Sequence, residues 1–221
     1  MPTAGRWIFF NWSRMTTFLL VRHGYTEWIE KELLHGISDQ PLSEFGFKQA
    51  EMTAAYLKST PIDRMYASPL LRAMQTAEKI SKTTGVQPLP LADLREENYG
   101  WQEGKRDWWP FVRNRKALIP LYTIMRLVIS TLSGEPTWQF RKRIAGVWNK
   151  IKQENPEGTV AVVAHAGVLR MILLQEFGGS RLNTTLYPIS ACSVSRVSIN
   201  GKGPQLLSVN EHAHLPEESC L

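Results

Sequence analysis

Two apolar runs in the chain each end in a histidine that is followed at once by small residues. The first, FLLVRHG, closes on His23 and Gly24, and the second, VAVVAHAG, closes on His165 and Gly167. Continuous apolar runs are typical of parallel strands that are buried on both faces. Open α/β sheets bind their ligands beyond the carboxyl ends of such strands. The pattern predicts two imidazoles at one ligand crevice, and a phosphate pocket is the first hypothesis.

Other polar side chains follow two further apolar runs. The run 62–68 predicts a third strand, and Arg72 falls in the first turn of the helix predicted after it. Glu96 lies in a turn after the short apolar run 88–91, and Arg22 precedes the first histidine. A guanidinium binds phosphate oxygens bidentately, and an imidazole can attack phosphorus. These are the residue types that phosphoryl transfer without a metal ion requires.

The rest of the chain alternates predicted strands with predicted helices. The turn Asn200-Gly201-Lys202-Gly203 separates two apolar runs and predicts a hairpin at the edge of a sheet. We therefore expect an α/β fold: a doubly wound, mostly parallel sheet with helices on both faces, with a helical cap insertion. Helices are expected over 43–59, 70–84 and 168–177, and hairpin strands over 192–199 and 205–209.

The length and composition fit one domain. A chain of 221 residues with 43% hydrophobic residues can bury one sizeable core without disulfides. We expect this domain to span 15–221 and residues 1–14 to be an extension outside the fold. The extension has too short an apolar core for a signal peptide or a membrane span. The only two cysteines, Cys192 and Cys220, form no CxxC pair, which predicts a cytoplasmic protein without a metal site.

Positive charge is concentrated between the acid-bearing turn and the second histidine. Residues 104–152 contain 11 Lys or Arg against two acidic residues, a net charge of +9, whereas the whole chain carries +6. We expect the cap insertion at about 104–140. No nucleic-acid recognition motif accompanies the charge, so we expect no nucleic-acid partner.

Residues 117–132, within this segment, are almost continuously apolar. The run is shorter than the roughly 20 residues that cross a bilayer, which excludes a transmembrane helix. Three interpretations stay open. The run forms a helix packed on the core or on a second copy in a homodimer, a cap over an apolar leaving group, or a helix held at a membrane surface by flanking cations and tryptophans.

Taken in order, the motifs resemble those of the histidine phosphatase (phosphoglycerate mutase-like) superfamily. They are RHGYTEW from Arg22, LSEFG from Leu42, SPLLRAMQTA from Ser68, LREENYG from Leu94 and AHAG from Ala164. Their order and spacing are most similar to the bacterial branch that includes alpha-ribazole phosphatase and broad-specificity phosphatases. The resemblance covers nearly all of the chain from Met15 onward.

The resemblance implies hydrolysis of a small-molecule phosphate ester through a covalent phosphohistidine, without a metal ion or another cofactor. The resemblance implies Glu96 as the general acid, and the adjacent Glu97 is an alternative for that role. The implied catalytic residues are His23 as nucleophile, Glu96 as general acid and His165, and the implied phosphate-binding residues are Arg22, Arg72, Thr26, Ala166 and Gly167.

Two alternative functions also stay open. One is transfer of the phosphoryl group back to the substrate, as in a phosphoglycerate mutase. The other is a weakly active phospholigand-binding or membrane-surface protein, because Ile29 and Pro136 stand where the family usually has Asn and Ser. His35, His212 and His214 are expected at the substrate rim or in packing.

Overall fold

A mixed six-stranded sheet forms the centre of the computed structural model, which describes residues 15–107, 109–112, 115–179 and 186–216. The strand order is β3-β2-β4-β1-β5-β6. The first four strands in this order are parallel, and β5 is antiparallel to β1 and to β6. The strands are β1 (Met15–Arg22), β2 (Arg64–Ala67), β3 (Pro88–Pro90), β4 (Gly158–Ala164), β5 (Val194–Asn200) and β6 (Gly203–Glu211).

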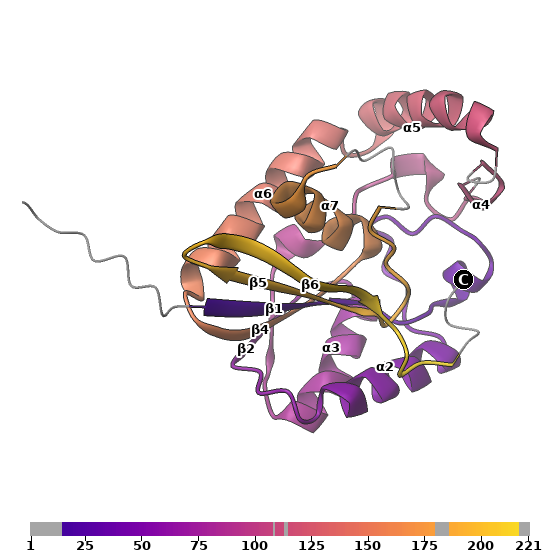
Figure 1. Ribbon diagram of the computed structural model, residues 1–221. Helices are drawn as coiled ribbons and strands as arrows, with labels where there is room; N and C mark the ends of the chain where they lie inside the picture. The colour runs from indigo at the N-terminus through magenta and orange to yellow at the C-terminus, as the bar shows by residue number, and fades with distance from the viewer. Residues whose placement is uncertain (1–14, 108, 113–114, 180–185, 217–221) are drawn as a thin grey trace, which may run out of the picture.

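Helices cover both faces of this sheet, as the fold prediction requires (Figure 1). The helices α2 (Glu44–Leu57) and α3 (Leu71–Thr84) lie below the sheet in that view, and α6 (Thr137–Glu154) and α7 (Ala166–Phe177) lie above it. The predicted doubly wound α/β fold and its edge hairpin are therefore confirmed.

The continuous apolar run of β1 reflects burial on both sides. Phe18 and Leu20 belong to the cluster that includes residues of α6 and α7, and the Phe18 ring meets Trp148 edge-on at a centroid distance of 4.6 Å. Leu19 and Val21 belong to the cluster with α2 and α3. Because successive side chains of a strand point to opposite faces, the middle of a strand between two helical layers is apolar on both faces.

Short helices and turns connect the sheet to the cap. They are α1 (Glu27–Glu30), the 3₁₀ turns η1 (Ala92–Leu94) and η2 (Gly100–Gln102), α4 (Trp109–Val112), the 3₁₀ turn η3 (Lys116–Leu118) and α5 (Ile119–Ser133). The predicted apolar run 117–132 thus forms mainly α5, at the upper right in Figure 1. No helix among the described residues combines the length and the hydropathy that a membrane span requires. The predicted extension, 1–14, lies outside the described residues.

Candidate active site

The two strand-end histidines lie side by side because their strands are neighbours. Arg22 and Ala164 are register partners at the ends of β1 and β4, so His23 and His165 are the next residues along each strand. The His23 amide donates to the Ala164 carbonyl at 3.0 Å. Both side chains are buried, and their ring centroids are 5.0 Å apart. The structure therefore brings together the two imidazoles that the sequence places in one crevice.

The surroundings of His23 determine which ring nitrogen carries its proton. Nδ1 lies 2.7 Å from the Gly24 carbonyl, which can only accept a hydrogen bond, so this nitrogen is the protonated one. Nε2 keeps its lone pair and accepts from Arg72 Nε at 3.3 Å. Burial, and then the charge of Arg72, hold the pKa of His23 well below its ordinary value. His23 is therefore a neutral imidazole with a nucleophilic Nε2.

His165 is held in the same tautomer as His23, with its ring proton on Nδ1. Its Nε2 lies 2.7 Å from Ser68 Oγ, and that oxygen also accepts from the Leu70 amide at 3.4 Å. Within the part of the chain that the structure describes, Nε2 is the only acceptor that the Ser68 hydroxyl contacts, so the hydroxyl donates to it and the ring proton lies on Nδ1. Burial and the charge of Arg72 lower the pKa of His165 well below its ordinary value. His165 is a neutral donor.

Two guanidinium groups stand beside the histidines. Arg72 is fully buried, and its Nη1 and Nη2 donate to the carbonyls of Ser38 and Gly36, both at 2.8 Å. Burial lowers the pKa of Arg72 to about 10, so the group is still charged at neutral pH. Arg22 Nη1 donates to the Ile189 carbonyl at 2.7 Å. The site therefore holds two fixed positive charges beside a neutral nucleophile.

Two buried polar atoms of the site have no hydrogen-bond partner among the described residues. They are Arg22 Nε and His165 Nδ1. A buried donor without an acceptor costs about 1–3 kcal/mol. A phosphate oxygen would accept a hydrogen bond from each of them. These two donors therefore fit a phosphate ester as ligand.

Glu96 reaches the first turn of α7. Its carboxylate accepts from the Gly167 amide at 3.0 Å and from the Glu97 amide at 2.9 Å. A Cβ on residue 167 would lie 2.3 Å from Glu96 Oε1, so only glycine leaves room for this contact. The Glu96 carboxyl group therefore contacts the residue that lies two positions after His165 in the chain. This contact favours Glu96 over Glu97 as the acid. The Gly167 amide, a predicted phosphate contact, serves Glu96 in this structure.

Thr26, another predicted phosphate contact, is engaged by its neighbours. Its hydroxyl caps α1 by accepting from the Ile29 amide at 3.2 Å, and it also bonds to Nε2 of His35. Burial lowers the pKa of His35 to about 3, and its ring lies 6.5 Å from that of His23. His35 thus lies at the rim of the site, one of the two places expected for it.

Arg143 is a site residue that the sequence reasoning missed. It donates to the carbonyls of Asp93 (2.7 Å), Arg95 (2.8 Å) and Glu96 (3.3 Å), and its Nε donates to Glu135 Oε1 at 2.8 Å. One guanidinium thus joins α6 to the turn that carries the candidate acid. In the sequence it stands in a run of three cations, Arg141-Lys142-Arg143, and no local signal marks it as the one that is mostly buried.

Glu103 is a second such residue. Its carboxylate accepts from the amides of Ile37 (3.0 Å), Ser38 (2.8 Å) and Tyr99 (3.0 Å). It thereby fixes the loop whose carbonyls receive Arg72. Glu103 lies 66 positions from Ile37 and 65 positions from Ser38 in the chain, so short-range sequence patterns do not indicate these two contacts.

The remaining predicted histidines have packing roles. His214 stacks on Tyr56 at a centroid distance of 4.3 Å, and its Nε2 lies 3.0 Å from Thr53 Oγ1. His212 bonds to the Asn210 carbonyl. Across the described ranges, no group of three His, Cys, Asp or Glu side chains is arranged to hold a metal ion.

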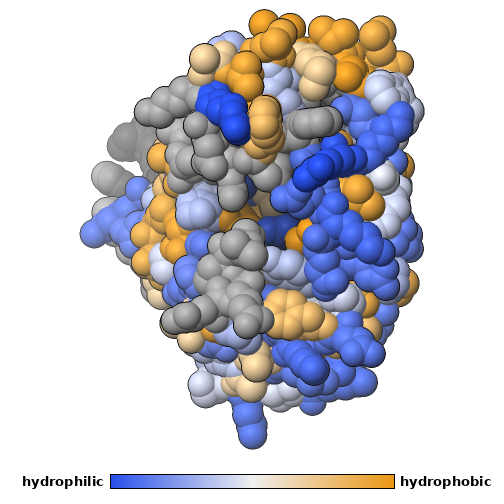
Figure 2. Space-filling model, turned by 90° about the vertical axis from the view of Figure 1, so that its right-hand side faces the viewer, coloured by the Kyte–Doolittle hydropathy of each residue, from blue (hydrophilic) through white to orange (hydrophobic). Residues whose placement is uncertain are grey.

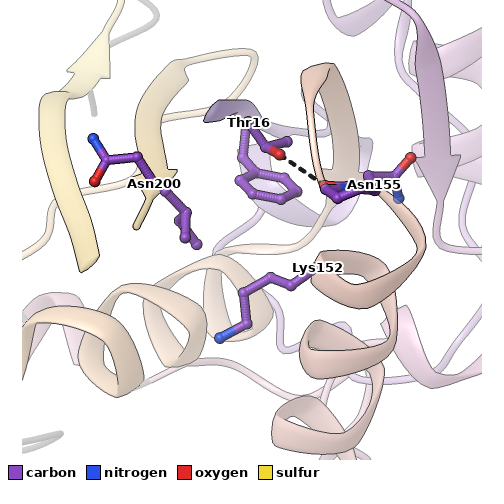
Figure 3. A pocket seen from close by; sticks show the side chains of 7 residues that line it. Thr16, Lys152, Asn155 and Asn200 are labelled. Carbon is purple, nitrogen blue, oxygen red and sulfur yellow. Dashed lines mark hydrogen bonds between the residues drawn. The ribbon is translucent and has the colours of Figure 1, made fainter. Parts of the chain in front are cut away.

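A cavity at the other end of the sheet is unrelated to this chemistry. Thr16, Lys152, Asn155 and Asn200 line it near the amino end of β1 (Figure 3). Its volume is about 140 Å³, below the roughly 300–1,000 Å³ of typical small-molecule sites. The Thr16 hydroxyl donates to the Asn155 carbonyl at 2.7 Å, which closes one wall. The candidate active site is therefore the histidine pair at the carboxyl ends of β1 and β4.

Three known proteins are similar to this chain along most of its length. The uncharacterized phosphatase PhoE of Bacillus subtilis is 29% identical over 203 residues, which cover 91% of this chain and 97% of that protein. The solved phosphoglycerate mutase of Bacillus anthracis superposes with a TM-score of 0.76 at 22% identity, over 92% of this chain and 96% of the other. The alpha-ribazole phosphatase of Shigella flexneri gives 0.75 at 22% identity, over 88% and 96%.

The two solved structures show that the fold is shared, as the motifs predicted. The model of the histidine phosphatase superfamily (branch 1) matches residues 18–212, nearly the whole of the described chain. The match includes all five motifs and every predicted site residue. The chain belongs to the histidine phosphatase superfamily, branch 1.

Proposed function

We propose that this chain hydrolyses phosphate monoesters by transferring the phosphoryl group first to His23 and then to water. The observation that carries the proposal is the neutral His23, whose Nε2 lone pair lies beside the buried Arg72 guanidinium. The family and the phosphatase names among the relatives support hydrolysis over the mutase alternative.

In the first step, His23 Nε2 attacks phosphorus and the ester P–O bond breaks. Glu96 in its protonated form gives its proton to the departing alcohol oxygen. Arg22, Arg72 and the Nδ1–H of His165 bind the equatorial phosphate oxygens, where preorganised donors are each worth about 3–4 kcal/mol in well-studied sites. The amide of Ala166 at the start of α7 has no partner within its helix and is a further donor.

In the second step, a water molecule attacks the phosphorus of phosphohistidine. The Glu96 carboxylate takes a proton from this water, and the P–Nε2 bond breaks. Inorganic phosphate leaves, and His23 returns to the neutral tautomer. The substrate is a small-molecule phosphate ester whose leaving group is set by the cap.

The test is phosphate release in the presence of EDTA from p-nitrophenyl phosphate, a sugar phosphate, 3-phosphoglycerate and phosphoserine. We expect turnover that survives the chelator and disappears in His23→Ala. His212→Ala is the matched control, because within the described residues its ring bonds to Asn210 and to none of the proposed catalytic or phosphate-binding residues, and it should keep activity. Quenching wild type with alkaline sodium dodecyl sulfate during turnover of ³²P-labelled substrate should trap a phosphoenzyme that is stable to alkali and labile to acid. Turnover in His23→Ala equal to wild type would refute the proposal.

A further inference from the structure

The helix α5 exposes an apolar stripe to solvent. Leu121, Ile124, Met125, Val128 and Leu132 recur at the spacing of one helix face, and all five are exposed, Leu121 to 67% and Leu132 to 81%. Figure 2 shows hydrophobic side chains gathered along the upper edge of the molecule, where α5 lies, with strongly hydrophilic ones below them. A contiguous exposed apolar surface of this kind marks an interaction site.

The other side of α5 attaches it to the protein. Tyr122 is buried and donates to Asp107 Oδ1 at 2.9 Å. At its carboxyl end the backbone approaches η2 so closely that a Cβ on Gly100 would lie 1.9 Å from the Ser133 carbonyl oxygen. The exposed stripe is therefore an outward face of an anchored helix, and packing on the protein's own core does not account for it.

Near each end of α5, on a neighbouring segment, an exposed aromatic side chain lies beneath a cation. Before the helix, the Arg115 guanidinium lies 3.8 Å from the centroid of the Phe111 ring. At the other end, Lys105 Nζ lies 3.7 Å from the centroid of the Trp101 ring. Aromatic rings and long cationic side chains are the residues that favour the boundary between lipid chains and headgroups.

The charge around the stripe is predominantly positive. The acidic side chains nearest to α5 in the chain, Asp107 and Glu135, are bonded to Tyr122 and Arg143. Residues 108–134 contain four Lys or Arg and no acidic residue. The first turns of α6, directly after α5, expose Trp138, Arg141 and Lys142. A two-fold dimer through the stripe would set this basic surface against its own copy, because such an interface pairs identical patches. An anionic lipid surface instead complements both the apolar stripe and its cations.

We propose that α5 docks this protein on the surface of an anionic phospholipid bilayer. The helix lies in the plane of the interface, with Leu121, Ile124 and Leu132 among the acyl chains and the flanking Lys and Arg side chains at the headgroup phosphates. This proposal is independent of the proposed phosphatase activity.

Co-sedimentation of the full chain with vesicles tests the proposal. We expect binding to phosphatidylcholine vesicles that contain about one third phosphatidylglycerol, little binding to pure phosphatidylcholine, and release at high salt because the attraction is screened. Leu121→Ser combined with Leu132→Ser should weaken partitioning by about tenfold or more. The matched control is Leu89→Ser with Leu207→Ser, two exposed leucines on β3 and β6.

A second pair of variants isolates the charge. Arg141→Gln with Lys142→Gln should weaken binding several-fold, about fivefold or more, whereas Lys48→Gln with Lys58→Gln removes two exposed charges from α2 and its end and should leave it unchanged. Far-ultraviolet circular dichroism checks that each variant is folded.

Several outcomes would overturn the proposal. They are no vesicle binding, equal binding to neutral and anionic vesicles, or unchanged binding of either Leu121→Ser with Leu132→Ser or Arg141→Gln with Lys142→Gln. Light scattering that shows a dimer lost in Leu121→Ser with Leu132→Ser would assign the stripe to a second copy. If Leu121→Ser with Leu132→Ser changed the hydrolysis rate of a long-chain alkyl phosphate, and the wild type bound no vesicles, the stripe would be assigned to contact with the leaving group.

Discussion

The reactivity of His23 depends on a single ring proton, and the Gly24 carbonyl fixes where it is. With Nδ1 tied to this carbonyl, Nε2 is left for the substrate. Arg72 contacts the same nitrogen while it holds two loop carbonyls. The proposed nucleophile is thereby oriented before any substrate arrives, which is the preorganisation that lowers the barrier of a charged reaction.

The lowered pKa values of His23 and His165 lead to a prediction about titration. Both imidazoles should stay neutral as the pH falls from 8 to 5, because their burial disfavours the charged form. NMR of the protein with ¹⁵N-labelled histidine would report it: the ring nitrogens of these two residues should not shift over that range. A titration midpoint near 6.5 for His23 would contradict the assignment.

The acid role of Glu96 is tested by the leaving group. Glu96→Gln should reduce hydrolysis of an alkyl phosphate by about 10²-fold or more, because the departing alkoxide needs a proton. Hydrolysis of p-nitrophenyl phosphate should fall much less, since nitrophenolate leaves without one. The comparison is kcat/KM for both esters in Glu96→Gln and Glu97→Gln. The same selectivity in Glu97→Gln alone would exchange the two roles.

At the scale of elements, Arg143 links α6 to the turn that carries Glu96. We expect Arg143→Gln to slow the alkyl ester by about tenfold and p-nitrophenyl phosphate less, because the acid loses its position and the nucleophile does not. A simple loss of stability would lower both rates equally. Arg141→Gln, an exposed neighbour on the same helix, is the control, and an equal loss for both esters in Arg143→Gln would refute the positioning role.

The elements that the sequence predicted are those determined by local patterns. The runs at β1 and β4 are apolar because helices cover both faces, and the histidines follow them directly, so their proximity follows from the parallel pairing. Helix α7 begins at Ala166, two residues before its predicted start, because His165 itself is the extended residue that precedes the first turn. The mostly parallel sheet, its edge hairpin and both helical layers were therefore within reach of sequence reasoning, whereas the order of the strands was not predicted.

The contacts that sequence reasoning missed depend on packing between loops that are far apart in the chain. Glu103 and Arg143 act on backbone groups far along the chain, and neither belongs to an apolar pattern. The contacts of Thr26 with His35 and of Gly167 with Glu96 likewise depend on tertiary packing. The exposure of α5 was left open because a helix that is apolar on all sides fits a core, a cap or a membrane surface equally. The cytoplasmic location stays a prediction.

For the molecule as a whole, the buried neutral histidines make stability depend on pH. The folded state holds the pKa of His23 and His165 below the ordinary 6.5 of an unfolded chain, so below that pH the unfolded state binds more protons. The free energy of unfolding should therefore be highest above pH 6.5 and should fall as the pH decreases, by up to about 1.4 kcal/mol per pH unit for each group.

Urea denaturation at pH 7.5, 6.0 and 5.0 measures this dependence. The double variant His23→Gln with His165→Gln should flatten the curve below pH 6.5, because the two titrating groups are gone. A slope unchanged by this double substitution would assign the acid sensitivity to other groups.

The register of β1 against β4 also limits how the two histidines can change during evolution. Neighbouring strands lie about 4.8 Å apart, and the two rings are 5.0 Å apart, so the sheet's own repeat supplies their separation. A one-residue insertion in either strand would move one ring by about 3.3 Å along the sheet and turn it to the opposite face. The loops beyond the strands face no such restriction. A lineage can therefore remodel the cap and exchange substrates by insertion and deletion, while the reacting pair changes only by substitution.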